Sequence, residues 1–320
     1  MKKNGFAPIL IILSIAILGV VGYFIYKNSV NQNMWPALKD VDITSISVKD
    51  ISAPDCKTNK EDYIDCLAEV HINGKNGKEY LLLTTDNVVT DSRTPVFTGK
   101  FVYLIKRIGN SVYPSNDWTD ELWKYNDRGQ STKLFSVQGL TFVPSTNDKL
   151  IAVTSGSDKI SFIDGLGNVV KESPLNQLGD SRIIEQSEIG LDSWTSDDST
   201  FWGDLWMGPA KLEFFTIMPS DWSVKKYNLS GLNIGTEVAL NPNKGIIAFS
   251  DYPAIFDSDS LARFQASKKT VTLYLYDLKT GIKTSIATSQ TKQFEQKWVD
   301  ENTIGYDNPN GSGKLEYILK

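Results

Sequence analysis

The chain has 320 residues, of which 41% are hydrophobic and 22% charged, and this composition is typical of a folded protein rather than a disordered one. Its net charge is −5. An acidic protein is a poor partner for nucleic acid or for anionic lipid. The chain has one histidine and two cysteines, a supply that excludes most zinc sites and most catalytic triads.

An uncharged apolar stretch fills residues 4–26. A helix of about 20 residues crosses a hydrocarbon core of about 30 Å, so this stretch is long enough to span a bilayer. Lys2 and Lys3 precede it, and the positive-inside rule then keeps the N-terminus in the cytoplasm and places the rest of the chain outside. The alternative is a cleaved signal peptide, but the apolar core is longer than such peptides have and lacks a small-x-small site. We therefore expect residues 1–27 to form an uncleaved single-pass anchor, inserted through residues 5–26.

Residues 28–40 are predicted to be a polar tether, and residues 41–320 an all-β domain. In that domain the apolar residues alternate, with Val, Ile, Thr and aromatic residues in the runs and Gly, Asn and Asp between them. Hairpins recur, with turns near residues 75, 128, 166, 220 and 280. Such a period indicates radial or linear repetition, and a β-propeller is the closure that leaves only short, protected sheet edges.

The clearest repeats are Asn241-Pro-Asn-Lys-Gly245 and Tyr276-Asp-Leu-Lys-Thr-Gly281. They resemble the TolB-like and WD40-like propeller repeats, in which a Pro-Asp-Gly-type turn precedes a Tyr-Asp-x-x-Thr-Gly hairpin. The resemblance covers most of residues 93–320 and implies a fold, not an activity. We expect about six four-stranded blades, with five or seven as alternatives. A strand such as 42–51 is a candidate to complete the last blade, which has three recognisable strands. The predicted blades are 41–86, 93–136, 138–172, 189–229, 236–288 and 293–320.

Cys56 and Cys66 are ten residues apart in the part of the chain predicted to lie outside the cytoplasm. An oxidising compartment permits a disulfide between them, which would staple an irregular region close to the first hairpin. The alternative is two free thiols. The predicted role of this pair is structural.

Catalytic and metal-binding motifs are missing from the sequence. His71 lies in an alternating strand and no Gly-x-Ser-x-Gly accompanies it, so we expect a solvent-facing strand residue. Acidic clusters at 117–121, 197–198 and 257–259 do not follow a calcium-loop spacing, and solvated turns are the simplest interpretation, with calcium as the alternative. We predict no catalytic residue, no metal site and no cofactor.

Long loops give the best indication of function. In a four-stranded blade, the loop between the second and third strands and the connection to the next blade lie on the same face. The predicted loops 109–120 and 253–267 are long, as is the connection 173–188, and the second loop is expected to hold a helical turn started by Ser258 or Asp259. Long loops on a rigid scaffold often bind ligands, and exposed aromatic side chains often dominate binding. The predicted binding residues are Tyr113, Trp118, Phe256 and Phe264.

The sequence therefore predicts a membrane-anchored, extracytoplasmic β-propeller that binds a protein, peptide or glycan through its loop-rich face and is not an enzyme. One alternative is a propeller enzyme of lyase or glycosidase type that uses carboxylates in a central channel. The predicted first strands are mostly apolar, with Glu237 as the exception. The other alternative is a structural part of a cell-envelope complex.

Overall fold

The computed structural model divides the chain into two compact units, with the boundary between Leu140 and Thr141. The predicted anchor, residues 5–26, and the predicted tether, residues 28–40, lie outside the described residues. Within the described ranges no helix is long and apolar enough to cross a membrane. The structure describes residues 43–51, 63–90, 94–110, 117–156, 158–179, 187–207, 210–229, 231–232, 234, 237–252, 258–290, 292–309 and 311–319.

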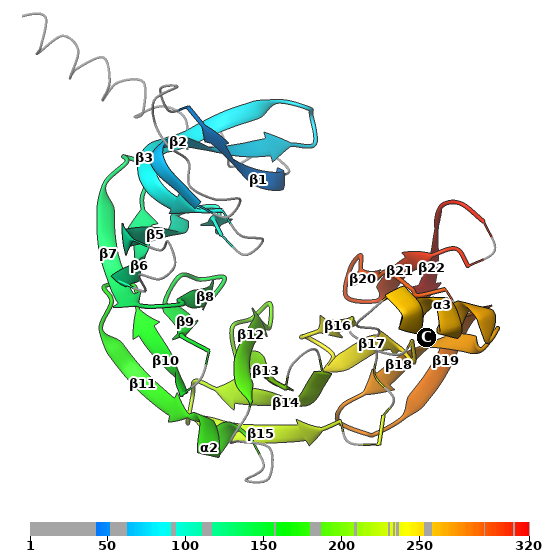
Figure 1. The fold of residues 1–320 in the computed structure, drawn as a ribbon. Coiled ribbons are helices and arrows are strands. Elements are labelled where there is room, and N and C mark those ends of the chain that lie inside the picture. Colours follow the sequence, from blue (N-terminus) through cyan, green and yellow to red (C-terminus); the bar gives the residue numbers. More distant parts are fainter. Residues whose placement is uncertain are drawn as a thin grey trace, which may run out of the picture. The chain divides into compact units, whose positions relative to one another are not determined.

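The first unit contains a seven-stranded antiparallel sheet, drawn from blue to green in Figure 1. The strand order is β1-β2-β3-β5-β6-β7, and the short β4 pairs with β5. The strands are β1 (Ile43–Asp50), β2 (Tyr63–Gly74), β3 (Glu79–Val89), β4 (Val96–Phe97), β5 (Val102–Asn110), β6 (Asp117–Tyr125) and β7 (Ser131–Val137).

The predicted strand 42–51 exists as β1, but its predicted partner is wrong. It pairs with β2 instead of completing the last blade. The apolar pattern explains this pairing, because Ile46 and Val48 lie opposite Ile72 and Val70 and pack against the same core. A partner that is close in sequence also costs less loop-closure entropy than a distant one.

The predicted blades 41–86 and 93–136 are not separate sheets. Pairing of Val88 with Lys106 joins β3 to β5, so the strands of both regions belong to one sheet. The described residues of the whole chain therefore form five sheets, where about six four-stranded blades were predicted.

The second unit consists of four sheets that follow one another along the chain (Figure 1). In each sheet consecutive strands pair antiparallel, which is the organisation of a β-propeller blade. Sheet I contains β8 (Thr141–Pro144), β9 (Leu150–Thr154), β10 (Lys159–Asp164) and β11 (Val169–Pro174), and sheet II contains β12 (Glu188–Trp194), β13 (Phe201–Met207), β14 (Ala210–Met218) and β15 (Ser223–Asn228). Sheet III contains β16 (Val238–Asn241), β17 (Ile246–Ser250), β18 (Thr270–Asp277) and β19 (Lys283–Gln290), and sheet IV contains β20 (Gln296–Trp298), β21 (Thr303–Asp307) and β22 (Lys314–Ile318).

The predicted all-β fold of propeller type is thus confirmed. The predicted blades 138–172, 189–229, 236–288 and 293–320 coincide with sheets I to IV. Sheet IV has three strands among the described residues, as the sequence indicated.

Neighbouring sheets of the second unit pack through aromatic side chains. In β13 the consecutive residues Phe201 and Trp202 face opposite sides of sheet II, because side chains alternate along a strand. The ring centres of Phe201 and Phe162 of sheet I are 5.5 Å apart. Trp202 instead packs with Tyr227 and with Phe249 of sheet III. A single strand therefore supplies one ring to each of two interfaces.

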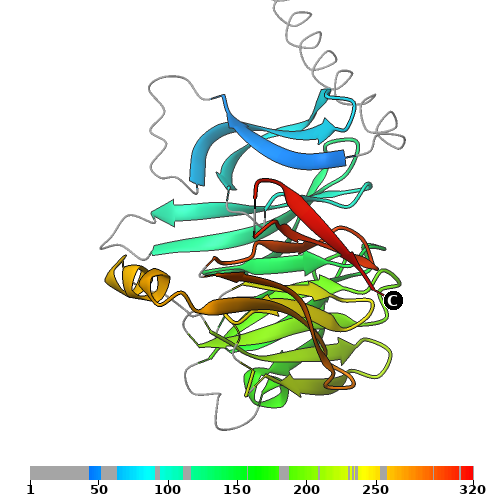
Figure 2. The ribbon, with the colours of Figure 1, turned by 90° about the vertical axis from the view of Figure 1, so that its right-hand side faces the viewer.

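Among the described residues, two helices lie between the strands, the short α2 (Leu175–Leu178) and α3 (Ser258–Ala266). The second begins at Ser258, where the sequence predicted a helical turn, and it projects from the end of sheet III in Figure 2. Phe264 of this helix lies against Tyr252, with ring centres 5.1 Å apart, and joins a core that includes Leu273 and Phe294.

Candidate functional site

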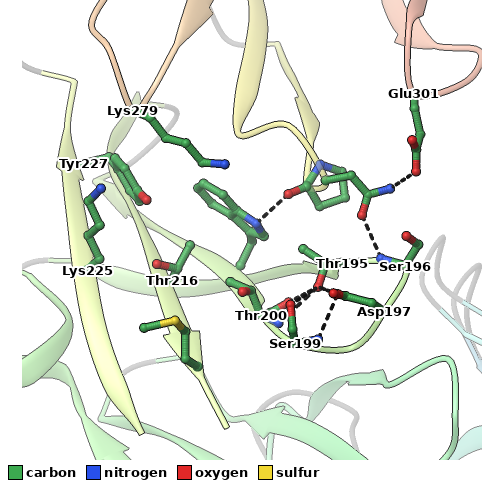
Figure 3. A pocket seen from close by; sticks show the side chains of 14 residues that line it. Thr195, Ser196, Asp197, Ser199, Thr200, Thr216, Lys225, Tyr227, Lys279 and Glu301 are labelled. Carbon is green, nitrogen blue, oxygen red and sulfur yellow. Dashed lines mark hydrogen bonds between the residues drawn. The ribbon is translucent and has the colours of Figure 1, made fainter. Parts of the chain in front are cut away.

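A pocket of about 530 Å³ lies in the second unit, where the turns that join the first and second strands of sheets II, III and IV meet (Figure 3). Its volume is in the range of sites that bind small molecules or short segments, roughly 300–1,000 Å³. The lining residues are Thr195, Ser196, Asp197, Ser199, Thr200, Trp202, Thr216, Met218, Lys225, Tyr227, Pro242, Asn243, Lys279 and Glu301.

The floor of the pocket is the packed interface between sheets II and III. Trp202 stacks on Tyr227, with ring centres 5.3 Å apart and an angle of 23° between the planes. Its indole Nε1 donates a 3.0 Å hydrogen bond to the carbonyl of Pro242, which fixes the ring against sheet III. Thr216 of β14 pairs with Trp202 of β13 on one side and with Lys225 of β15 on the other, so these three residues form one row across sheet II. The apolar floor is therefore bordered by the hydroxyl of Thr216 and the amine of Lys225.

Two lysines stand at one end of the pocket (Figure 3). Lys225 Nζ is 5.0 Å from the centre of the Tyr227 ring. Lys279 comes from the turn between β18 and β19, where the Asp277 carboxylate accepts a 2.7 Å bond from the Lys279 amide. Both lysines are exposed, and among the described residues neither amine has a hydrogen-bond or ion-pair partner. Two positive charges therefore remain available to a ligand.

Gly245 allows Lys279 to lie where it does. Its φ of +68° is in the left-handed region that favours glycine, and a Cβ there would lie 3.1 Å from Cε of Lys279 and 3.3 Å from the ring of Trp202. The Gly245 carbonyl also accepts a 3.0 Å bond from the amide of Leu278. The two repeats that resemble propeller motifs thus meet at this edge of the pocket.

Two carboxylates, Asp197 and Glu301, occupy the other end of the pocket (Figure 3). Asp197 accepts a 2.7 Å bond from the Thr195 hydroxyl and a 3.0 Å bond from the Ser199 amide. These bonds, the Thr195 hydroxyl first, lower the pKa of Asp197 from 3.8 to about 2. Glu301 accepts a hydrogen bond from the side-chain amide of Asn243. Asp197 is therefore ionised at neutral pH and committed to its own turn.

Side chains link the first turns of the four sheets in series, and we call this set of bonds the turn series. Asp198 of sheet II accepts bonds of 2.7 and 2.8 Å from the amide and hydroxyl of Thr146 in sheet I. The amide of Ser196 donates a 2.7 Å bond to Asn243 of sheet III, and Asn243 donates to Glu301 of sheet IV. The rim of the pocket is therefore braced from one sheet to the next.

The sequence-predicted binding residues do not form this pocket. Tyr113 and Phe256 lie outside the described residues. Phe264 is a half-buried packing residue of α3, and Trp118 belongs to strand β6 rather than to a loop tip. The predicted loop 109–120 is shorter than expected because β5 and β6 extend into it.

Trp118 covers an ion pair of the first unit. Its ring centre lies 4.1 Å from the guanidinium of Arg107. That guanidinium donates bonds of 2.8 and 3.2 Å to Asp120, a carboxylate with 2% of its surface exposed. A buried carboxylate needs such a partner, so packing accounts for the position of Trp118.

The predicted solvent-facing position of His71 is wrong. It is buried in β2 with 8% exposure, and its Nε2 lies 2.9 Å from a carboxylate oxygen of Glu69. The neighbouring strands β1 and β3 cover it on both sides. The predicted disulfide stays a prediction, since Cys56 lies outside the described residues and the described side chains do not include that of Cys66.

Sequence reasoning missed Lys225 and Lys279. The signal for Lys279 was present, because a lysine inside an Asp-Leu-Lys-Thr-Gly turn is held at a hairpin tip. No comparable signal marks Lys225. It is one of two adjacent lysines on β15 that occupy opposite faces of the sheet, and the sequence alone does not distinguish it from Lys226.

Comparison with known proteins identifies a shared fold and no family. No family model matches the chain, and no curated protein matches it in sequence. Among solved structures, an oligogalacturonate lyase in complex with manganese is similar with a TM-score of 0.50 and 12% identity over 79% of this chain and 72% of the lyase.

Two further solved structures are similar at lower scores. The β-propeller domain of the trilobed protease from Pyrococcus furiosus has a TM-score of 0.49 and 12% identity, covering 88% of this chain and 81% of that domain. A putative TolB from Agrobacterium tumefaciens has a TM-score of 0.40 and 11% identity, covering 81% and 86%. Identities this low concern fold alone.

Proposed function

We propose that this chain is a membrane-anchored, extracytoplasmic binding protein of β-propeller type, without catalytic activity, whose ligand site is the pocket between sheets II and III. The observation that carries the proposal is the pair of exposed lysines, Lys225 and Lys279, whose amines have no hydrogen-bond or ion-pair partner among the described residues and which lie beside a rigid aromatic floor. An unsatisfied charge on a preorganised surface is suited to binding, because little ordering is needed when the ligand arrives.

The chemistry of the pocket favours binding over catalysis. A general acid or base works best with a pKa close to the operating pH. Asp197 has the opposite property, because the Thr195 hydroxyl and the Ser199 amide lower its pKa to about 2. Asp197 is therefore ionised at neutral pH, where a general acid would have to carry a proton.

The membrane part of the proposal rests on the amino-acid sequence. The apolar residues 5–26 are long enough to span a bilayer, and Lys2 and Lys3 favour a cytoplasmic N-terminus. In this arrangement residues 28–40 separate the propeller from the bilayer. Closure of the sheets into a ring belongs to the same proposal.

Site-specific photo-cross-linking tests the site. A benzophenone amino acid at Met218, which lines the pocket and is 41% exposed, should cross-link to a partner in intact cells. The same probe at Leu166, a 75% exposed turn residue outside the pocket, should not give that product. Replacing both Lys225 and Lys279 with Gln should remove the Met218 product. Equal products from both positions, or a Met218 product that survives the double replacement, would contradict the proposal.

A second candidate function is catalysis by carboxylates away from the pocket. Glu237, which precedes β16, has a raised pKa because of desolvation first and then the charges of Glu295 and Asp307. Carboxylates with raised pKa values are common at catalytic sites, and the similar lyase structure makes an elimination on an acidic polysaccharide the natural trial. Incubation with oligogalacturonate should then yield ultraviolet-absorbing unsaturated product, which Glu237→Gln should abolish. Absence of product from the unaltered protein removes this candidate.

A further inference from the structure

We infer that the pocket binds an extended peptide segment of a partner protein and that Lys225 and Lys279, at one end of the pocket, attract an acidic side chain of that segment. This inference rests on the proposed function and adds the chemical class of the ligand. A carboxylate is the complement of an ammonium group, and a charge-assisted hydrogen bond between them is stronger than a neutral one.

The aromatic rings of the pocket favour a peptide over a glycan. A sugar-binding site would present the flat face of an aromatic ring to the ligand. Trp202 is only 2% exposed and Tyr227 only 8%, and the two rings cover each other. The rings therefore serve as a buried support and leave no open platform for a pyranose.

The remaining groups suit a peptide backbone and an apolar stem. Thr216 lies in the register row beside Lys225, and its hydroxyl has no hydrogen-bond partner among the described residues. It is free to bond a ligand amide or carbonyl. Met218, 41% exposed, adds an apolar contact on the same strand.

The distribution of charge limits where an acidic side chain of the segment can lie. Lys225 and Lys279 attract an acidic side chain at one end, while the ionised Asp197 and the carboxylate of Glu301 repel a second one at the other end (Figure 3). A run of acidic residues is therefore a poor ligand. A segment with a single Asp or Glu near the lysines and neutral or basic residues near Asp197 and Glu301 fits both ends.

The experiment is selection of peptides on the full chain in detergent. A displayed library of random heptapeptides is panned against the unaltered protein, the Lys225→Gln/Lys279→Gln variant and Lys283→Gln. Lys283 is a matched control, because its amine also lies over a tyrosine ring, 4.5 Å from the centre of Tyr274, but outside the pocket. We expect peptides with one Asp or Glu to be enriched on the unaltered protein and on Lys283→Gln, and not on the double variant.

A direct binding measurement completes the test. Fluorescence anisotropy of an enriched peptide should show affinity about tenfold weaker for the double variant, and about tenfold weaker when the peptide acid becomes Gln, with the loss growing smaller at high salt. Enriched peptides that depend on the lysines but carry no acid would overturn the acidic class and leave the proposed site standing. Lysine-dependent binding on a carbohydrate array without peptide enrichment would overturn the peptide class. No lysine-dependent binding of either kind would overturn the inference and the proposed function together.

Discussion

Two adjacent aspartates in the turn between β12 and β13 show how residues of the same type take different tasks. Asp197 closes its own turn through Thr195 and Ser199, whereas Asp198 reaches to the preceding sheet and accepts bonds from Thr146 and Asn147. Asp198 also adopts a φ of +57°, a left-handed conformation that Asp tolerates better than most residues. The two positions therefore respond differently to substitution.

Replacing Asp198 with Ala should lower the melting temperature, at a cost of roughly 2 kcal/mol, because a charged acceptor of several hydrogen bonds is lost. Asp198→Gly separates the causes, since Gly fits the positive φ and removes only the hydrogen bonds. Thermal unfolding of both variants checks the prediction. If Asp198→Gly melts like the unaltered protein, the bonds to sheet I contribute no stability.

Replacing Asp197 with Asn should have an effect that depends on pH. The folded protein lowers the pKa of this carboxyl from 3.8 to about 2, so its ionised form stabilises the fold above pH 3.8, and this contribution is lost as the pH falls toward 2. The unaltered protein should therefore melt above Asp197→Asn at pH 7, and the two should converge near pH 2. Asp127→Asn, at an exposed turn of the first unit, is the control and should show no such convergence. A difference that stays constant with pH would contradict the assignment.

At the scale of elements, tryptophans at the ends of first strands fasten one sheet to the next. The indole of Trp194 in β12 donates a 3.1 Å bond to the carbonyl of Val143 in β8. The indole of Trp298 in β20 donates a 3.0 Å bond to the carbonyl of Ala239 in β16. The same contact thus recurs between sheets I and II and between sheets III and IV.

Replacing Trp298 with Ala should cost roughly 3 kcal/mol of stability, because a large ring leaves a packed interface and a carbonyl loses its donor. Trp298→Phe should cost less, since it keeps most of the packing and removes only the hydrogen bond. Melting curves of the two variants test this order. Equal melting temperatures for Trp298→Ala and the unaltered protein would mean that sheet IV does not depend on this contact.

The elements themselves were largely predictable, and their partners were less so. Turn chemistry such as Asp277-Leu-Lys-Thr-Gly281 marks a hairpin because it is local. Membership of β1 in the first sheet and the junction of Val88 with Lys106 depend on pairings that no short window of sequence contains. The pocket was missed for the same reason, since it combines residues from turns more than a hundred positions apart, such as Thr195 and Glu301.

At the scale of the whole molecule, topology is the first prediction. A Ser29→Cys variant should react with a membrane-impermeant thiol reagent in intact cells once any outer barrier is permeabilised, because residue 29 follows the predicted anchor on its outer side. Labelling is read by mass shift against the unaltered protein. Reaction only after lysis of the inner membrane would place the propeller in the cytoplasm.

The redox state of the two cysteines is the second prediction at this scale. In an oxidising compartment Cys56 and Cys66 should be joined, and a non-reducing peptide map should contain the linked pair. Purification under denaturing conditions with an alkylating reagent prevents thiol–disulfide exchange before the map is made. Two alkylated cysteines would remove the disulfide and one support for the outer location.

Where a bond of the turn series has a backbone donor, tolerance to substitution is unequal on its two sides. In the bond from Ser196 to Asn243 the donor is a backbone amide, which every residue except proline supplies, while the acceptor is a particular side chain. Position 196 is therefore open to nearly any residue and position 243 is not. A sheet grafted here from another propeller would therefore have to supply an acceptor side chain at the position of Asn243.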